Sequence, residues 1–184
     1  MFQFHLLTQF PELQHGIANR ESEQQQSYHA RAQQVHGVRY AWVDGPRLQP
    51  VPRTDALLTD TPGVRLRIGT ADCTPIILYD PSTQRGGVIH AGLKGTTQGI
   101  LTEVLQEFNP TQVYLGIGPA IGPDCYDDID IQTENVIQAL QAGVPLAQIE
   151  VMRVCTQCAS DTFFSYRAGD RNSNFGSYFE LVKV

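Results

Sequence analysis

The chain has 184 residues, enough for one well-buried core but short for two ordinary domains, so a single domain over 1–184 is expected. Its formal net charge is −6, and its 13 Lys and Arg form no runs, which argues against a groove for nucleic acid. It opens with no basic and apolar leader, and no stretch approaches the ~20 apolar residues of a membrane span, so we expect a cytoplasmic protein without a membrane partner.

The first half of the chain predicts a short amino-terminal helix followed by strands. The polar run at 23–26 is expected on that helix. Alternation of apolar and basic residues over 64–68 predicts a half-exposed strand, whereas the apolar runs at 76–79 and 87–89 predict buried strands. A turn at 80–83 joins these two buried strands, so they are expected to form a hairpin.

The second half alternates helices and strands. Thr96 is expected to cap a helix whose apolar positions follow helical spacing up to Phe108, with Asn109-Pro110 ending it. A second helix is expected over 135–142, ended by Gly143. Strands are expected over 112–117, 149–154 and 176–182, and the loop 118–123 is rich in Gly and Pro. The predicted class is α+β, with helices packed on mixed β-sheets.

Three isolated residues have the chemistry of metal ligands: His36, Cys73 and His90. Cys73 follows His36 by 37 positions and His90 follows Cys73 by 17, so only the tertiary fold can bring them together. Structural zinc is usually bound by four ligands in closely spaced pairs, whereas three dispersed ligands are typical of a catalytic zinc with one open position. The predicted hairpin would bring Cys73 and His90 to neighbouring strands.

The remaining cysteines, the acidic run and the glycine-containing segment do not predict a further functional site. Four cysteines without a secretion signal are expected to be thiols, and Cys155 and Cys158 lack the second ligand pair of a zinc knuckle, so we expect them not to be ligands of the metal centre. The acidic run 127–130 is interpreted as a solvated loop leading into a helix, and Gly116-Ile117-Gly118 is not a dinucleotide fingerprint. No organic cofactor is expected.

Six ordered motifs resemble a family variously called multicopper polyphenol oxidase or laccase-like, purine nucleoside phosphorylase, and peptidoglycan editing factor. The resemblance runs from about His15 to Tyr166. The family pattern has Q-V-H-G, D-A-L-x-T, T-A-D-C-x-P, H-A-G-W-R-G-T, G-P-x-I-G-P-x-C-Y, and C-T with F-F-S-Y-R. The same order stands here at 34–37, 55–59, 70–75, 90–96, 118–126, and 155–156 with 163–167.

The resemblance implies that His36, Cys73 and His90 are zinc ligands. It also implies a zinc-dependent purine nucleoside enzyme, with a purine nucleoside and phosphate as its small-molecule partners. The implied reactions are phosphorolysis of adenosine, inosine or guanosine and deamination of adenosine. Where the family has Trp-Arg, this chain has Leu93-Lys94, which keeps a cation but removes the planar guanidinium fork.

Two residues near the ligands are candidates for catalysis. Asp72 could orient a histidine or act as a general base. Lys94, just before the expected helix start at Gly95-Thr96, is the first candidate cation for phosphate, with Arg167 as the second.

Three alternatives stay open at this point. Cys73 could be the nucleophile of a metal-free hydrolase acting on cell-wall precursors. The changes at Leu93, Lys94 and Gln14 could leave an inactive purine-binding protein. Copper in the His-Cys-His site could give weak phenol oxidation, although five histidines are too few for a full multicopper oxidase.

Overall fold

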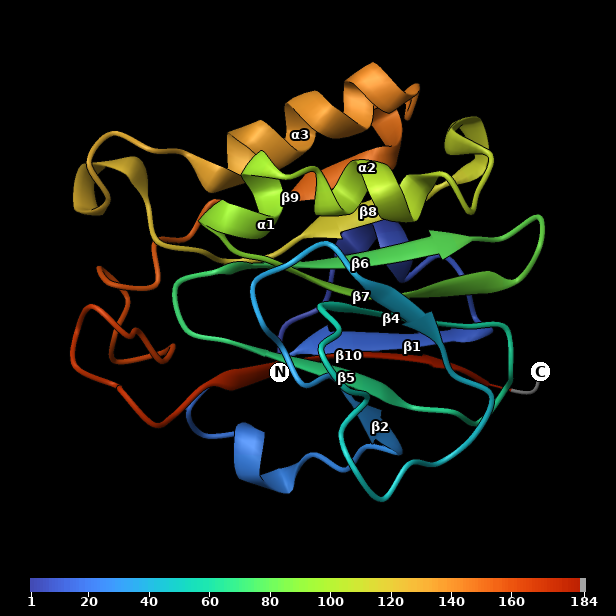
Figure 1. Cartoon of the computed structure of the whole chain (residues 1–184), viewed down its shortest axis with the longest axis horizontal. Helices are drawn as coiled ribbons and strands as arrows, with labels where there is room; N and C mark the ends of the chain where they lie inside the picture. The colour runs from blue at the N-terminus through green and yellow to red at the C-terminus, as the bar shows by residue number, and fades with distance from the viewer. Residues whose placement is uncertain (183–184) are drawn as a thin grey trace.

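Two β-sheets and a layer of helices stack on one another in the computed structural model, which describes residues 1–182 (Figure 1). The smaller sheet has the strand order β1 (Leu13–Ile17), β10 (Phe175–Leu181), β5 (Leu66–Thr70) and β2 (Ala30–Arg31). The larger sheet has the order β3 (Tyr40–Trp42), β4 (Ala56–Thr59), β7 (Arg85–Ala91), β6 (Thr74–Asp80), β8 (Tyr114–Ile117) and β9 (Ile149–Val151). Both sheets mix parallel and antiparallel pairs, so the predicted α+β class is confirmed.

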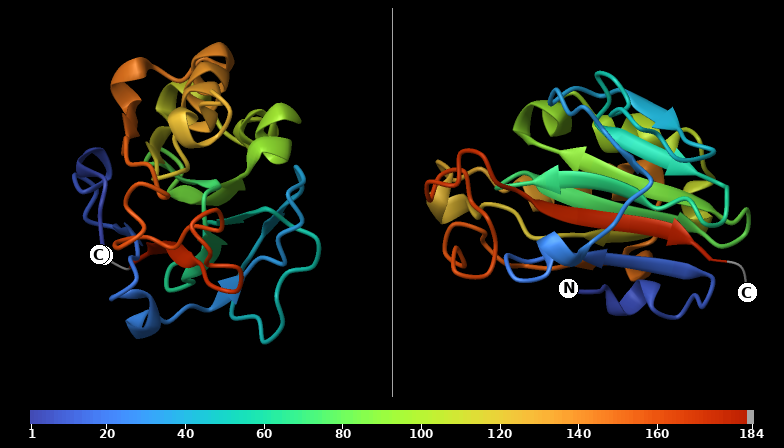
Figure 2. Two further views of the ribbon diagram at one scale, coloured as in Figure 1. Left: turned by 90° about the vertical axis from the view of Figure 1, so that its left-hand side faces the viewer. Right: turned by 90° about the horizontal axis from the view of Figure 1, so that it is seen from below.

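The helices cover the larger sheet on the face away from the smaller one, as the left view of Figure 2 shows. They are α1 (Leu93–Thr97), α2 (Ile100–Leu105) and α3 (Ile131–Ala142). Single 3-10 turns complete the described chain: η1 (His5–Leu7), η2 (Glu23–Gln25), η3 (Pro110–Gln112), η4 (Pro123–Cys125) and η5 (Leu146–Gln148). None of the described helices is long and apolar enough to cross a bilayer, and the expected cytoplasmic location stays a prediction.

The central strands β6 and β7 are buried on both faces because the larger sheet lies between two apolar layers. Ile77 and Tyr79 of β6 point into the core between the sheets, whereas Ile76 and Leu78 pack with the helices. Burial on both faces explains why this strand is a continuous apolar run rather than an alternating one. The predicted hairpin is confirmed, with Pro75 opposite His90 in the β6–β7 register.

The predicted helix after Thr96 is wrong in its start and its continuity. Helix α1 already begins at Leu93, and Thr96 lies inside it, fully buried, with its hydroxyl accepting a hydrogen bond from Asn135 Nδ2 at 3.0 Å. Gly99 then takes a left-handed φ of 82° and separates α1 from α2. A residue without a Cβ adopts this conformation readily, so the glycine permits the break.

Several other boundaries differ from the sequence-based expectation. The run at 23–26 forms only the 3-10 turn η2, and the strand expected over 64–68 begins and ends two residues later, as β5. Helix α3 begins at Ile131 because Asp130 caps it by accepting from the Thr133 N–H, which agrees with a loop leading into a helix. Strand β9 ends at Val151, where its partner β8 ends at Ile117.

Candidate metal centre and cavity

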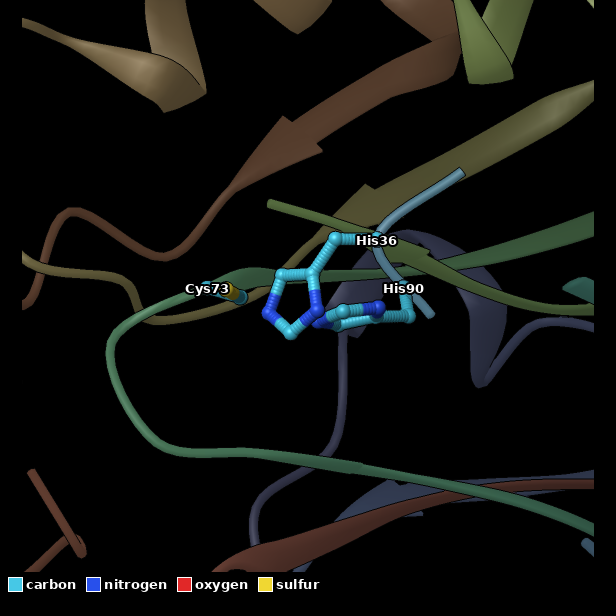
Figure 3. Close-up of side chains that lie close together, drawn as sticks. All are labelled: His36, Cys73 and His90. Atoms are coloured by element: carbon cyan, nitrogen blue, oxygen red, sulfur yellow. The ribbon is translucent and has the colours of Figure 1, made fainter. Parts of the chain in front are cut away.

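The structure brings together the three residues that the sequence singles out as metal ligands (Figure 3). His36 comes from the loop between β2 and β3, Cys73 directly precedes β6, and His90 lies near the end of β7. One ligand atom of each residue lies within 4.8 Å of the other two. His36 is exposed, Cys73 half-buried and His90 buried, so the group opens to solvent on one side.

Asp55 holds both histidines in place. Its Oδ1 lies 2.9 Å from His90 Nδ1 and accepts the backbone N–H of His36 at 2.8 Å, and its Oδ2 accepts the N–H of Gly37 at 2.8 Å. These bonds hold the loop at His36, whose φ is +58°. They also leave Nε2 of His90 free to face the other ligands. From the sequence, Asp55 was identified only as part of the motif at 55–59 and was assigned no role. Its place in that motif was the signal that could have pointed to it.

Charge in the metal-free site is set by competition between burial and hydrogen bonding. Burial raises the pKa of the Cys73 thiol, but interactions with His36 and His90 outweigh it and lower this pKa to about 6. Burial lowers the pKa of His90, but Asp55 and Cys73 outweigh it and raise that pKa to about 9. Without metal these interactions therefore favour a thiolate on Cys73 beside a protonated His90.

Gly92 leaves the space that the ligands need. A Cβ at this position would lie 2.8 Å from Cys73 Sγ and 3.0 Å from His36 Cδ2. The site therefore combines two imidazole nitrogens, one low-pKa thiol, a carboxylate behind one imidazole and close approach of the backbone. Zinc takes these ligand types, and the three residues fit a zinc ion with one position left for water or substrate.

The three ligands open into a cavity of about 1010 Å³. Its walls include Asp72, Lys94, Tyr126 and Arg167, together with Arg171, which the sequence analysis did not consider. The guanidinium of Arg167 lies 4.5 Å from the centre of the Tyr126 ring. Although the whole chain is acidic, three exposed cations, Lys94, Arg167 and Arg171, stand at the rim of this cavity, whose lining also includes the carboxylates of Asp72 and Asp170.

Asp72 accepts hydrogen bonds from Thr156 and Arg167, and the carboxylate beside His90 is that of Asp55. Asp72 Oδ1 accepts the Thr156 hydroxyl at 2.7 Å and its Oδ2 accepts the Arg167 N–H at 2.8 Å, whereas Asp55 lies against His90. Asp72 directly precedes Cys73, so these two hydrogen bonds link Thr156 and Arg167 to the chain beside that cysteine. Lys94 is an exposed residue of the first turn of α1, not a residue before a helix start.

The cysteines outside this centre form a second group. Cys155 and Cys158 form a group separate from the His36 group, and Cys125, which the sequence did not connect with them, joins them. Contact between residues 33 positions apart in the chain could not be read from spacing. All four cysteines are free thiols, as expected.

The other histidines bear on the copper alternative. His15 Nε2 accepts the Phe4 N–H at 3.0 Å, and His29 Nδ1 accepts the Arg65 N–H at 2.9 Å. These two rings satisfy backbone donors that lie directly before η1 and directly before β5. One ring nitrogen of each of these two histidines is therefore engaged in the fold, and neither histidine belongs to the His36 group.

The sequence matches the family model described as multi-copper polyphenol oxidoreductase laccase over residues 14–128 and 127–184. The chain belongs to this family. The resemblance found from the six motifs is thus confirmed at the level of the family.

Curated proteins that are similar to this chain have other activities in their names. The chain is 36% identical over 152 residues to purine nucleoside phosphorylase YlmD of Geobacillus stearothermophilus, covering 64% of this chain and 56% of that protein. It is 29% identical over 153 residues to adenosine deaminase RL5 of an unknown prokaryotic organism, covering 65% and 58%. The chain thus spans a little over half the length of these curated relatives.

The fold agrees with solved structures of the family. The crystal structure of YlmD from Geobacillus stearothermophilus superposes with a TM-score of 0.78 at 30% identity, covering 84% of this chain and 73% of that one. The α+β architecture with mixed sheets is therefore shared.

Proposed function

We propose that this chain is a zinc-dependent purine nucleoside enzyme that uses phosphate for phosphorolysis of adenosine, inosine or guanosine and also deaminates adenosine. The observation that carries the proposal is the opening of the His36, Cys73 and His90 group into a cavity with a cationic rim. The names of the two curated relatives support both reactions. When bound, zinc would supply Lewis-acid chemistry that activates water or polarises a substrate oxygen.

The charged side chains at the rim fit a phosphate substrate. Lys94, Arg167 and Arg171 are exposed cations that face the same cavity as the proposed ligands. In phosphorolysis a phosphate oxygen forms a bond to C1′ of the ribose while the bond from C1′ to the purine nitrogen breaks. Cations at the rim would hold the phosphate dianion near C1′ and lower the entropic cost of this encounter.

The aromatic residues of the cavity fit a purine base. Tyr126 and Tyr166 both line the cavity, and each has an arginine over its ring, Arg167 at 4.5 Å and Arg171 at 4.0 Å from the ring centre. A planar base can stack on such a ring or on the guanidinium above it. Asp72 is our proposed proton-transfer group, since each carboxylate oxygen keeps an acceptor position beyond its recorded hydrogen bond.

Separate assays of the two reactions test this function. Metal-replete protein is mixed with adenosine, with and without phosphate, and adenine and inosine are quantified early in the reaction, while adenosine is in large excess over inosine. We expect adenine only with phosphate and inosine in both mixtures, with part of the inosine converted to hypoxanthine where phosphate is present. His36→Ala, Cys73→Ala and His90→Ala should each lose about one equivalent of metal and both activities, whereas exposed His5→Ala should keep them. Absence of both products from metal-replete protein would reject the enzyme and favour the inactive purine-binding protein.

A metal-free cysteine hydrolase is the second candidate, because one observation favours it. In the absence of metal, Cys73 has a pKa of about 6 and lies against histidines, as an activated nucleophile does. Metal removal separates the two candidates. A chelated protein that hydrolyses cell-wall precursors, and loses this activity on alkylation of Cys73, would favour the hydrolase. Loss of nucleoside turnover on chelation and its return with zinc would favour the zinc enzyme.

A further inference from the structure

A second cluster of ligand-forming side chains lies outside the centre described above. The sulfur atoms of Cys125, Cys155 and Cys158 lie within 4.8 Å of one another, and Cys125 Sγ is 3.5 Å from Cys158 Sγ. Cys125 belongs to η4, and the other two belong to the turn that follows β9. These two segments lie at the same end of the molecule in Figures 1 and 2.

The spacing of the sulfur atoms suits a metal ion. Zinc–sulfur bonds of about 2.3 Å in tetrahedral geometry place neighbouring sulfur atoms roughly 3.8 Å apart. The observed separations, 3.5 Å for one pair and at most 4.8 Å for all, bracket that value. Small rotations of the cysteine side chains would bring all three sulfurs to it. The three residues are free thiols, so each is available as a ligand.

The backbone around the cluster is arranged for a sulfur ligand. The Gly122 N–H donates to Cys155 Sγ at 3.1 Å, which favours the thiolate form that a metal needs. A Cβ at Gly122 would lie 3.2 Å from Cys155 Cβ, so glycine permits this approach. Ala120 also pairs with Cys155, and the Thr156 N–H donates to the Ala120 carbonyl at 3.0 Å. These contacts join residues 120–122, just before Cys125, to residues 155–156, so the segments that carry Cys125 and Cys155 are already held side by side.

We propose that Cys125, Cys155 and Cys158 bind one thiophilic metal ion, for which Zn²⁺ is the test ion, in a site separate from the His36 centre. Three thiolates are the soft ligands that select Zn²⁺ or Cu⁺ over hard cations. Cys158 is exposed, so the ion can enter from solvent, and the fourth position is open to water.

The position of the cluster gives this ion a structural role at the cavity. Tyr126, next to Cys125, lines the cavity, and Thr156, next to Cys155, donates to Asp72 Oδ1 at 2.7 Å. An ion bound to the three thiolates would cross-link η4 to the turn after β9. It would thereby hold Tyr126 and Asp72, which both line the cavity, in place relative to one another.

The test counts metal in a chain that lacks the first centre. In the His36→Ala, Cys73→Ser double variant, Cys125, Cys155 and Cys158 are the remaining cysteines. We expect this protein to keep about one equivalent of zinc, and to show a thiolate-to-metal charge-transfer band when loaded with Co²⁺. Adding Cys155→Ser should abolish both signals, whereas Ser160→Ala, a change in the same turn, should abolish neither.

A folding measurement and a second cysteine variant ensure that the test of this metal site gives a clear result. Near-ultraviolet circular dichroism checks that each variant is folded, and Cys158→Ser, which changes an exposed side chain, replaces Cys155→Ser if that variant unfolds. No bound zinc in the folded double variant, or a Co²⁺ band that survives both Cys155→Ser and Cys158→Ser, would overturn the site. A Cys125–Cys158 disulfide in protein purified under reducing conditions would overturn it as well. Because the measurement is metal content without the first centre, its failure leaves the proposed function untouched.

Discussion

Asp55 Oδ1 lies 2.9 Å from His90 Nδ1, with both side chains buried. The same carboxylate accepts the backbone N–H groups of Val35, His36 and Gly37. One buried carboxylate therefore connects two proposed ligands that come from different parts of the chain. It fixes which nitrogen of His90 faces the metal position and holds the loop that carries His36.

Asp55→Asn should weaken zinc binding at the His36 centre by about 10–100-fold, the usual effect of removing a carboxylate behind a histidine ligand. The amide cannot supply the negative charge that favours proton donation from His90 Nδ1. Competition with a chromophoric chelator measures the affinity. Asp60→Asn, which changes an exposed aspartate just after β4, is the control. Equal affinities for the wild-type and Asp55→Asn proteins would contradict the role of Asp55.

Gly92→Ala should weaken zinc binding while leaving the fold intact. Gly92 has φ −77° and ψ 170°, which alanine adopts without strain, so the cost arises from contacts with Cys73 and His36 alone. The new methyl group would push these two ligands apart. Zinc content and thermal unfolding are measured together, with Gly45→Ala as the control because a Cβ there meets nothing within 4 Å. Full zinc affinity in Gly92→Ala would show that the ligands do not need this space.

The alkylation rate of Cys73 in metal-free protein should rise as pH increases through about 6 and then level off. The pKa of this thiol is lowered, so the reactive thiolate predominates above about pH 6 and is lost below it. Removing the imidazole in His90→Ala should move the midpoint to higher pH. Peptide mass spectrometry after iodoacetamide treatment follows Cys73 separately from the other cysteines. A midpoint near the ordinary thiol value of about 8.5 would refute the expectation.

Lys94→Arg should lower the Michaelis constant for phosphate roughly 2–10-fold, the effect of about one additional hydrogen bond. The guanidinium can hold two phosphate oxygens where the ammonium acts as a point charge. Deamination uses no phosphate and should change little. Steady-state assays of both reactions decide the matter, with Lys94→Gln expected to raise the constant for phosphate. An equal response of both reactions, or none in either, would remove Lys94 from phosphate binding.

Local signals in the sequence were sufficient for the central strands, and the motifs singled out the three candidate ligands that the fold brings together. The apolar runs at 76–79 and 87–89, with a turn between them, predicted the β6–β7 hairpin because strand pairing across a short turn is local. Gly143 was correctly placed at the end of α3, where its φ is +100°. His36, Cys73 and His90 were singled out because their side chains have the chemistry of metal ligands and their motifs resemble those of the family.

The tertiary structure alone decided the partners of these residues. Three contacts join segments between 33 and 84 positions apart: Asp55 with His90, Thr156 with Asp72, and Cys125 with Cys158. No periodicity encodes such contacts, because they follow from how the two sheets and the loops at one end of them pack. The break between α1 and α2 was missed for a related reason: burial of Thr96 against Asn135 of α3 outweighs its local preference for a cap position.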